Sequence, residues 1–136
     1  MTYHYDRIIR MADTDASGVI YFANMQKIAV ETFEDFLLSA GIELASLMLA
    51  GPLLVPIVHV EADYLAPVYI GEQLRVEMKL SKIGVTSFTL KYNIFSSEHD
   101  LVVATLTMTH VVTARESKKS VPIPQELLSI LERAKS

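Results

Sequence analysis

The hydrophobic pattern changes its period twice along the chain, and these changes decide what the chain can fold into. Residues 3–11 alternate in the manner of a β-strand. Over residues 22–40 apolar side chains recur every three or four positions with charged side chains between them, which predicts an amphipathic helix that Gly41 ends. Residues 43–50 predict a short second helix. One long helix therefore interrupts a chain whose other segments favour strands.

Strand patterns return after these helices. Four segments alternate or are rich in β-branched residues, and turn residues separate them. The predicted strands are residues 55–64, 74–83, 86–96 and 101–114. The closing segment, residues 121–135, predicts a short C-terminal helix. This order predicts an α+β domain in which a five-stranded antiparallel sheet packs against one long helix.

Length and charge narrow the class of protein. With 136 residues, 51% of them hydrophobic, the sequence predicts a single domain over residues 1–136 with a sizeable core. The net charge of −4 argues against a nucleic-acid partner, which a basic face would favour. The N-terminus lacks the apolar core of a secretory signal, and no stretch reaches the roughly 20 apolar residues of a membrane helix. We therefore predict a cytoplasmic protein with no membrane partner.

Composition also limits the chemistry. The sequence contains no cysteine, which excludes disulfides, thiolate nucleophiles and cysteine metal sites. Glycine-rich phosphate loops and the GxSxG motif of α/β-hydrolases are absent. We therefore predict no metal and no cofactor. The histidines lack metal-ligand spacing; they are His4, His59, His99 and His110.

Two aspartates, Asp13 and Asp15, lie in a turn directly before the predicted long helix. Aspartates are common in turns because their side chains bind nearby backbone N–H groups, and this is the simpler interpretation. The functional alternative is a carboxylate beside a helix N-terminus, where backbone N–H groups and the helix dipole favour developing negative charge. Such a carboxylate can attack a carbonyl group or activate water. Tyr21 and Phe22 mark the helix start, as core anchors or through their backbone N–H groups.

Further candidates lie in the strands and near the C-terminus. His59 lies within a predicted strand, where a structural role competes with ligand binding. Arg115, Lys118 and Lys119 form a basic cluster, which is either a solvated loop or a clamp for the phosphates of a nucleotide-bearing ligand.

Four motifs in order resemble one known family over nearly the whole chain. They are "ADTDASGVIYFAN", "VPIVHVEADYLAPVYIGEQL", "KIGVTSFTLKYNIF" and "ESKKSVPIPQEL". Together they resemble the hotdog-fold acyl-CoA thioesterases of the 4-hydroxybenzoyl-CoA thioesterase type. Within that family the details are most similar to the group that hydrolyses 1,4-dihydroxy-2-naphthoyl-CoA in phylloquinone and menaquinone biosynthesis. Met25, and the pair Ala16 and Ser17, depart from the residues that are frequent in the family.

The resemblance implies a fold and a catalytic group. The fold would be a hotdog, a five-stranded antiparallel sheet wrapped around one long central helix, with a short C-terminal helix added. Asp15 would be the catalytic carboxylate, as nucleophile or general base, and Asp13 would support the turn. The backbone N–H near Phe22 would stabilise the oxyanion of the thioester.

The resemblance also implies partners and binding residues. Val55, Ile57 and His59, placed on one face by strand alternation, and Tyr21 would contact the acyl group. Coenzyme A would be bound by Ser87, Arg115, Lys118 and Lys119. The protein would act as a homodimer or homotetramer with sites between subunits. The alternatives are another acyl-CoA substrate, a binding module that holds acyl-CoA without chemistry, and a hotdog dehydratase.

Overall fold

The computed structural model describes residues 1–20, 22–98 and 100–135. The predicted strands and helices are present, together with one small extra sheet. The elements in chain order are β1 (Tyr3–Ile8), η1 (Met11–Asp13), α1 (Phe22–Ser39), η2 (Ser46–Ala50), β2 (Leu53–Leu54), β3 (Ile57–Tyr64), β4 (Gln73–Ile83), β5 (Ser87–Ser96), β6 (Leu101–Val111), β7 (Thr113–Ala114) and α2 (Gln125–Glu132).

The main sheet has five antiparallel strands in the order β1-β4-β5-β6-β3, which confirms the sheet predicted from the sequence. Its edges are therefore β1 and β3. The predicted strand over residues 101–114 is divided, because the backbone N–H of Val112 donates to Thr86 while the next two residues leave the sheet as β7. There β7 pairs with β2, the short strand before Pro56.

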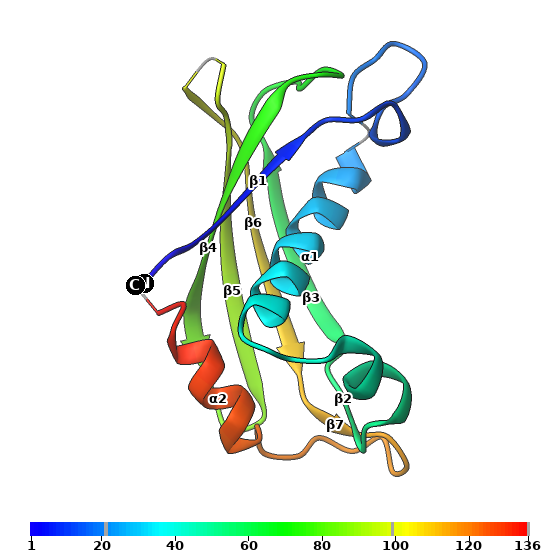
Figure 1. Cartoon of the computed structure of the whole chain (residues 1–136), viewed down its shortest axis with the longest axis vertical. Helices are drawn as coiled ribbons and strands as arrows, with labels where there is room; N and C mark the ends of the chain where they lie inside the picture. The colour runs from blue at the N-terminus through cyan, green and yellow to red at the C-terminus, as the bar shows by residue number, and fades with distance from the viewer. Residues whose placement is uncertain (21, 99, 136) are drawn as a thin grey trace.

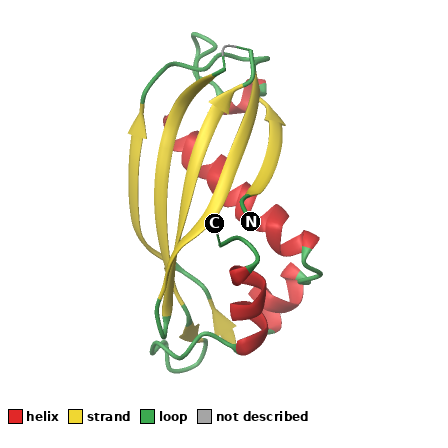
Figure 2. Cartoon of the chain, turned by 90° about the vertical axis from the view of Figure 1, so that its left-hand side faces the viewer, coloured by secondary structure: helices red, strands yellow, loops and turns green. Residues whose placement is uncertain are grey.

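Helix α1 covers one face of the sheet, and the two views agree on this (Figures 1 and 2). Its 18 residues confirm the predicted helix. Gly41, at φ +87°, then turns the chain in the left-handed region that favours glycine. Most of the apolar stripe predicted for this helix is buried, although Phe22 at its start is exposed; the buried apolar residues of α1 are Met25, Ile28, Ala29, Phe33, Phe36 and Leu37.

Smaller elements gather at the end of the sheet that lies away from the start of α1 (Figure 1). The predicted second helix is confirmed over residues 44–50, where two α-helical residues lead into the π-helical turn η2 (Ser46–Ala50). The predicted C-terminal helix is confirmed as α2, which buries Leu127, Ile130 and Leu131. After α2 the backbone of Leu80 donates to the carbonyl of Ala134 at 2.8 Å, and the two chain ends lie together (Figure 1).

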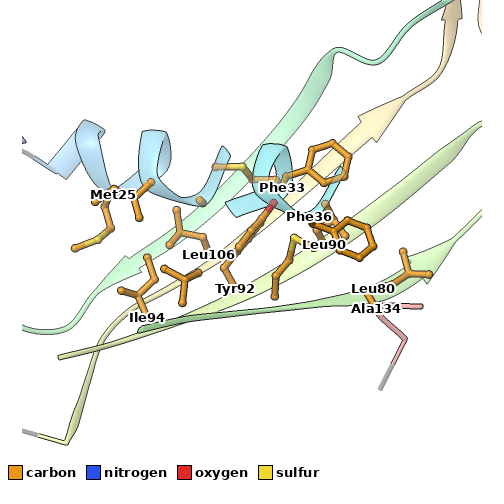
Figure 3. Close-up of a cluster of buried hydrophobic side chains, with 14 of the residues drawn as sticks. Met25, Phe33, Phe36, Leu80, Leu90, Tyr92, Ile94, Leu106 and Ala134 are labelled. Atoms are coloured by element: carbon orange, nitrogen blue, oxygen red, sulfur yellow. The ribbon is translucent and has the colours of Figure 1, made fainter. Parts of the chain in front are cut away.

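The Tyr92 hydroxyl is one of the buried polar atoms of the core that the described residues do not satisfy. Tyr92, on β5, is fully buried, and Figure 3 shows its ring between the strands and the helix. Its hydroxyl has no hydrogen-bond partner among the described residues. Burial raises the pKa of Tyr92, so the hydroxyl stays protonated. An unsatisfied buried hydroxyl lowers stability, because it loses its hydrogen bonds to water on folding.

We expect Tyr92→Phe to raise the free energy of unfolding by about 1 kcal/mol, because it removes that hydroxyl and keeps the ring. Urea denaturation at neutral pH measures the change. The matched control is Tyr3→Phe, which deletes a hydroxyl that donates to Asp35 and should lower stability. A loss of stability in Tyr92→Phe as large as that in the control would contradict the prediction.

Candidate active site

Asp15 lies in a tight turn that leads into α1. The turn closes through two backbone hydrogen bonds, from Asp15 to Val19 at 2.9 Å and from Gly18 to Asp15 at 3.1 Å. The Asp15 side chain is exposed. Its Oδ1 accepts two hydrogen bonds from Ser17, one from the backbone N–H at 2.8 Å and one from the side-chain hydroxyl at 2.6 Å. These bonds hold the pKa of Asp15 below its usual range. The carboxylate is therefore ionised at neutral pH and open to solvent.

Asp13 has a different environment. Its carboxylate is 1% exposed and accepts two hydrogen bonds from the Arg7 guanidinium, at 2.6 and 3.0 Å, and one from the backbone N–H of Arg10 at 2.8 Å. Burial alone would raise its pKa, but these contacts outweigh burial and hold the pKa of Asp13 below its usual range. Its carbonyl accepts a hydrogen bond from Asn24 of α1. Asp13 thus ties the turn to the helix, which agrees with the supporting role expected for it.

The start of α1 forms one wall of a small pocket. Phe22 begins the helix, and its half-exposed ring packs edge-on against Tyr64 at the end of β3, with the ring centres 5.9 Å apart. The pocket has a volume of about 290 Å³ and is lined by Ile20, Phe22, Met25, Tyr64, Leu65, Ala66 and Pro67. Tyr21 lies outside the described residues.

A larger pocket lies against the second half of α1. Its volume is about 580 Å³, and most of its walls are apolar. It is lined by Val30, Phe33, Glu34, Leu37, Leu44, Ala45, Leu47, Leu49, Val55, Ile57, His110 and Leu127. Val55 and Ile57, both predicted to contact a ligand, therefore line one pocket. Asp15 lines neither this pocket nor the small one.

The prediction that His59 shares a face with Ile57 is wrong. A β-bulge separates the two residues, because Ile57 pairs with His110 of β6 while His59 pairs with Thr109, the next residue of β6. The extra residue, Val58, breaks the alternation on which the prediction depended. His59 is exposed on the other side of the sheet, where its Nε2 lies 3.2 Å from Glu61.

His110 is a site residue that the sequence analysis did not single out. It is 4% exposed and lines the larger pocket. A signal for it was present, because His110 continues the inward alternation of Leu106 and Met108 along β6. A histidine at the end of such an apolar row is a polar group placed in the core.

The basic residues lie on the turn that follows β7. Lys118 and Lys119 are exposed there, whereas Arg115 is partly buried and donates from Nε to the carbonyl of Gly51 at 2.7 Å. Ser87 begins β5 opposite Val111, at the same end of the sheet. The fold thus gathers these four residues near the end of the molecule that holds the larger pocket.

The predicted site is consequently divided within one chain. The turn of Asp15, coloured blue in Figure 1, and the turn after β7, coloured orange, lie at opposite ends of the long axis. Helix α1 runs between these ends, with Phe22 near the first. The other predicted ligand-binding residues lie near the second end, with the turn after β7; they are Val55, Ile57 and the basic residues. One chain alone therefore does not bring the aspartate to the larger pocket.

Two other features bear on ligands and surroundings. Among the residues that the structure describes, no group of three histidine, aspartate or glutamate side chains is placed to hold a metal ion. Within the same residues, no helix has the length and apolar character needed to span a bilayer.

Comparison with known proteins identifies the family. Residues 9–131 match the thioesterase-like superfamily. The chain is 35% identical over 131 residues to the 1,4-dihydroxy-2-naphthoyl-CoA hydrolase of Synechococcus elongatus, covering 96% of this chain and 95% of that protein. It is 32% identical to the enzyme of the same name from Acaryochloris marina, with 95% of each covered. The crystal structure of a 1,4-dihydroxy-2-naphthoyl-CoA thioesterase from Synechocystis superposes with a TM-score of 0.90 at 29% identity, covering 96% of each chain. The chain therefore belongs to the thioesterase-like superfamily.

Proposed function

We propose that this protein hydrolyses the thioester of 1,4-dihydroxy-2-naphthoyl-CoA, an aromatic acyl-CoA of phylloquinone and menaquinone biosynthesis. The observation that carries the proposal is the 35% identity to a hydrolase of this name, which extends over nearly the full length of both chains. The larger pocket supports it, because an apolar space of about 580 Å³ is in the usual size range for a small-molecule site. The sheet is proposed to wrap around α1 in the hotdog manner, within one domain over residues 1–136.

The active site is proposed to form between two subunits that pair through β3. This strand is an edge of the main sheet and carries exposed apolar side chains, including Val58 at 58% and Ile57 at 39%. Exposed edges favour pairing with another strand. A symmetric dimer would pair β3 antiparallel with its copy, because the same surface meets itself across a two-fold axis.

Such pairing would reunite the divided site. In an antiparallel pair the Tyr64 end of one β3 lies beside the Ile57 end of the other. The Tyr64 end adjoins the start of α1 through the Phe22 contact, whereas the Ile57 end adjoins the larger pocket. Asp15 of one subunit would thus approach the acyl pocket of its partner. A homotetramer would be a pair of such dimers.

The proposed chemistry uses Asp15 in one of two ways. As a nucleophile, the carboxylate attacks the thioester carbonyl, coenzyme A leaves as a thiolate, and water then hydrolyses the acyl-enzyme anhydride. As a general base, it takes a proton from the water that attacks the carbonyl. Both routes consume one water and release the free acid and the coenzyme A thiol. The backbone N–H of Phe22 is proposed to stabilise the oxyanion, helped by the positive end of the α1 dipole.

The basic turn is proposed to bind the phosphates of coenzyme A. Lys118 and Lys119 are exposed near the end of the molecule that holds the larger pocket. Ser87 begins β5 at the same end. Arg115 donates from Nε to Gly51, and its positive charge is proposed to add to the attraction of this turn for phosphate. The cytoplasmic location stays a prediction.

A hydrolysis panel tests the proposed function. We expect 1,4-dihydroxy-2-naphthoyl-CoA to give the highest kcat/KM, about 10⁴ M⁻¹s⁻¹ or more, against 4-hydroxybenzoyl-CoA and short and long aliphatic CoA esters. Release of free thiol measures the rate. A higher value for another ester would make that ester the substrate. Tight binding without thiol release would instead favour a non-catalytic acyl-CoA-binding module.

A further inference from the structure

The His110 side chain is held rigidly at the wall of the larger pocket. Its imidazole stacks on Phe88, with ring centres 5.0 Å apart and planes within 8°, and it also contacts Phe33 at 5.0 Å. Its Nδ1 lies 3.1 Å from the backbone carbonyl of Val55. Two aromatic rings and one hydrogen bond therefore fix the direction of both ring nitrogens.

These contacts also fix where the ring carries its proton. A carbonyl oxygen only accepts hydrogen bonds, so Nδ1 must be the protonated nitrogen that donates to Val55. Burial lowers the pKa of His110, against a smaller opposite effect of that hydrogen bond, so the ring is neutral at pH 7. A neutral imidazole has one N–H, and Nε2 is consequently a hydrogen-bond acceptor.

This acceptor has no partner among the described residues. The Nε2 atom is buried and receives no hydrogen bond from them. The residue lines a pocket whose other side chains are apolar, apart from Glu34, which is exposed. Buried acceptors without a donor are rare because they are costly, so an oriented one at a pocket wall indicates a donor group on a ligand.

We infer that Nε2 of His110 accepts a hydrogen bond from a hydroxyl group on the bound acyl group, and that this contact selects hydroxylated aromatic acyl thioesters over unsubstituted ones. The inference rests on the proposed function, in which the larger pocket receives the acyl group. An aromatic acyl group without a hydroxyl would leave Nε2 unsatisfied, as it is among the described residues of the free chain, and would forgo this hydrogen bond. Sites that bind a substrate hydroxyl through a buried polar group reject analogues lacking it for this reason.

Two variants of His110 separate recognition from folding. In His110→Asn the side-chain amide takes the position of Nδ1 and can still donate to Val55, but nothing replaces Nε2. In His110→Gln the longer side chain places an acceptor oxygen near the position of Nε2 and gives up the bond to Val55. The readout is the ratio of kcat/KM for 1,4-dihydroxy-2-naphthoyl-CoA to that for 2-naphthoyl-CoA.

We expect the wild-type ratio to be at least about tenfold, the effect of one good hydrogen bond. His110→Asn should reduce the ratio to near one, because only the hydroxylated ester loses a contact with Nε2. His110→Gln should retain part of the preference. An unchanged ratio in His110→Asn, or an equal loss for both substrates, would overturn the inference.

A measurement on the wild-type protein needs neither folding of a variant nor hydrolysis. We expect the ¹⁵N chemical shift of His110 Nε2 to move when 1,4-dihydroxy-2-naphthoate binds and to stay in place when 2-naphthoate binds. Equal shifts with both acids, or no shift with either, would overturn the inference. If the selective shift occurs but no CoA ester is cleaved, the inference holds and the proposed hydrolysis fails.

Discussion

Replacing Asp15 by asparagine is expected to lower kcat for thioester hydrolysis by about 10²- to 10⁴-fold, the usual contribution of a positioned catalytic carboxylate. The amide keeps the size of the side chain and can still accept hydrogen bonds from Ser17. It lacks the negative charge that attacks the carbonyl or takes the proton from water. Stability should change little, because the side chain is exposed.

Thiol release from 1,4-dihydroxy-2-naphthoyl-CoA measures this effect. The control is Glu132→Gln, which makes a carboxylate-to-amide change at the exposed last residue of α2. This control variant should retain full activity. Light scattering should give the same oligomeric mass for both variants. Turnover by Asp15→Asn near the wild-type rate would remove Asp15 from the mechanism.

Mixed oligomers test whether the site joins two subunits. Val30 is partly exposed and lines the larger pocket from α1. The Val30→Trp variant should fill this pocket and should therefore be inactive, as Asp15→Asn should be. In a heterodimer of these two variants, the Asp15 of one chain meets the open pocket of the other. Refolding the two together should restore about a quarter of wild-type activity, since half of the dimers are mixed and each has one intact site. A site contained in one chain would give no restoration.

Replacing Asp13 by asparagine is expected to destabilise the fold by about 3 kcal/mol, the lower end of the cost of breaking a buried ion pair. Asp13 is 1% exposed, and the Arg7 side chain beside it is 12% exposed. The lower end applies because Arg7 keeps a second partner, Glu31, with Nε and Oε2 2.7 Å apart. Urea denaturation at pH 7 measures the loss.

The same variant has a pH dependence whose sign follows from the pKa of Asp13. That pKa is lower in the folded state than in the unfolded chain. The stabilisation is therefore fully present above the ordinary pKa of aspartate, about 3.9, and is lost as the pH falls through the lower folded value. The stability difference between wild type and Asp13→Asn should shrink below about pH 4.

An exposed ion pair provides the matched control. Asp6→Asn removes the partner of Arg75, and both of these side chains are 53% exposed. Exposed pairs contribute about 0–1 kcal/mol, so this variant should remain close to wild type. An Asp13→Asn variant no less stable than Asp6→Asn would show that the buried pair does not hold the turn to the helix.

The elements themselves follow from local patterns in the sequence. The three- and four-residue repeat over residues 22–40 predicted α1, and the alternation that followed predicted the strands of the main sheet. Both patterns work because burial of one face is decided by the spacing of neighbouring residues. The DxD turn was predictable for the same reason, since the hydrogen bonds of Asp15 to Ser17 are local.

The division between β6 and β7 depended on distant contacts. Val112 donates to Thr86 across the sheet, and β7 pairs with β2 some sixty residues earlier. The bulge at Val58 is similar, because it is defined by the register with β6 and not by any turn residue in β3. Strict alternation therefore placed His59 on the wrong face.

The sequence by itself determined the order of strands and helices and the turn that carries Asp15, because these depend on neighbours in the chain. Only the tertiary structure decided that Arg7 pairs with Asp13 and that His110 lies between Phe33 and Phe88. It alone also placed Asp15 and the larger pocket at opposite ends of α1. The physical reason is that these relations join residues far apart in the chain, and they exist only once the sheet has set its register and the helix has packed on it.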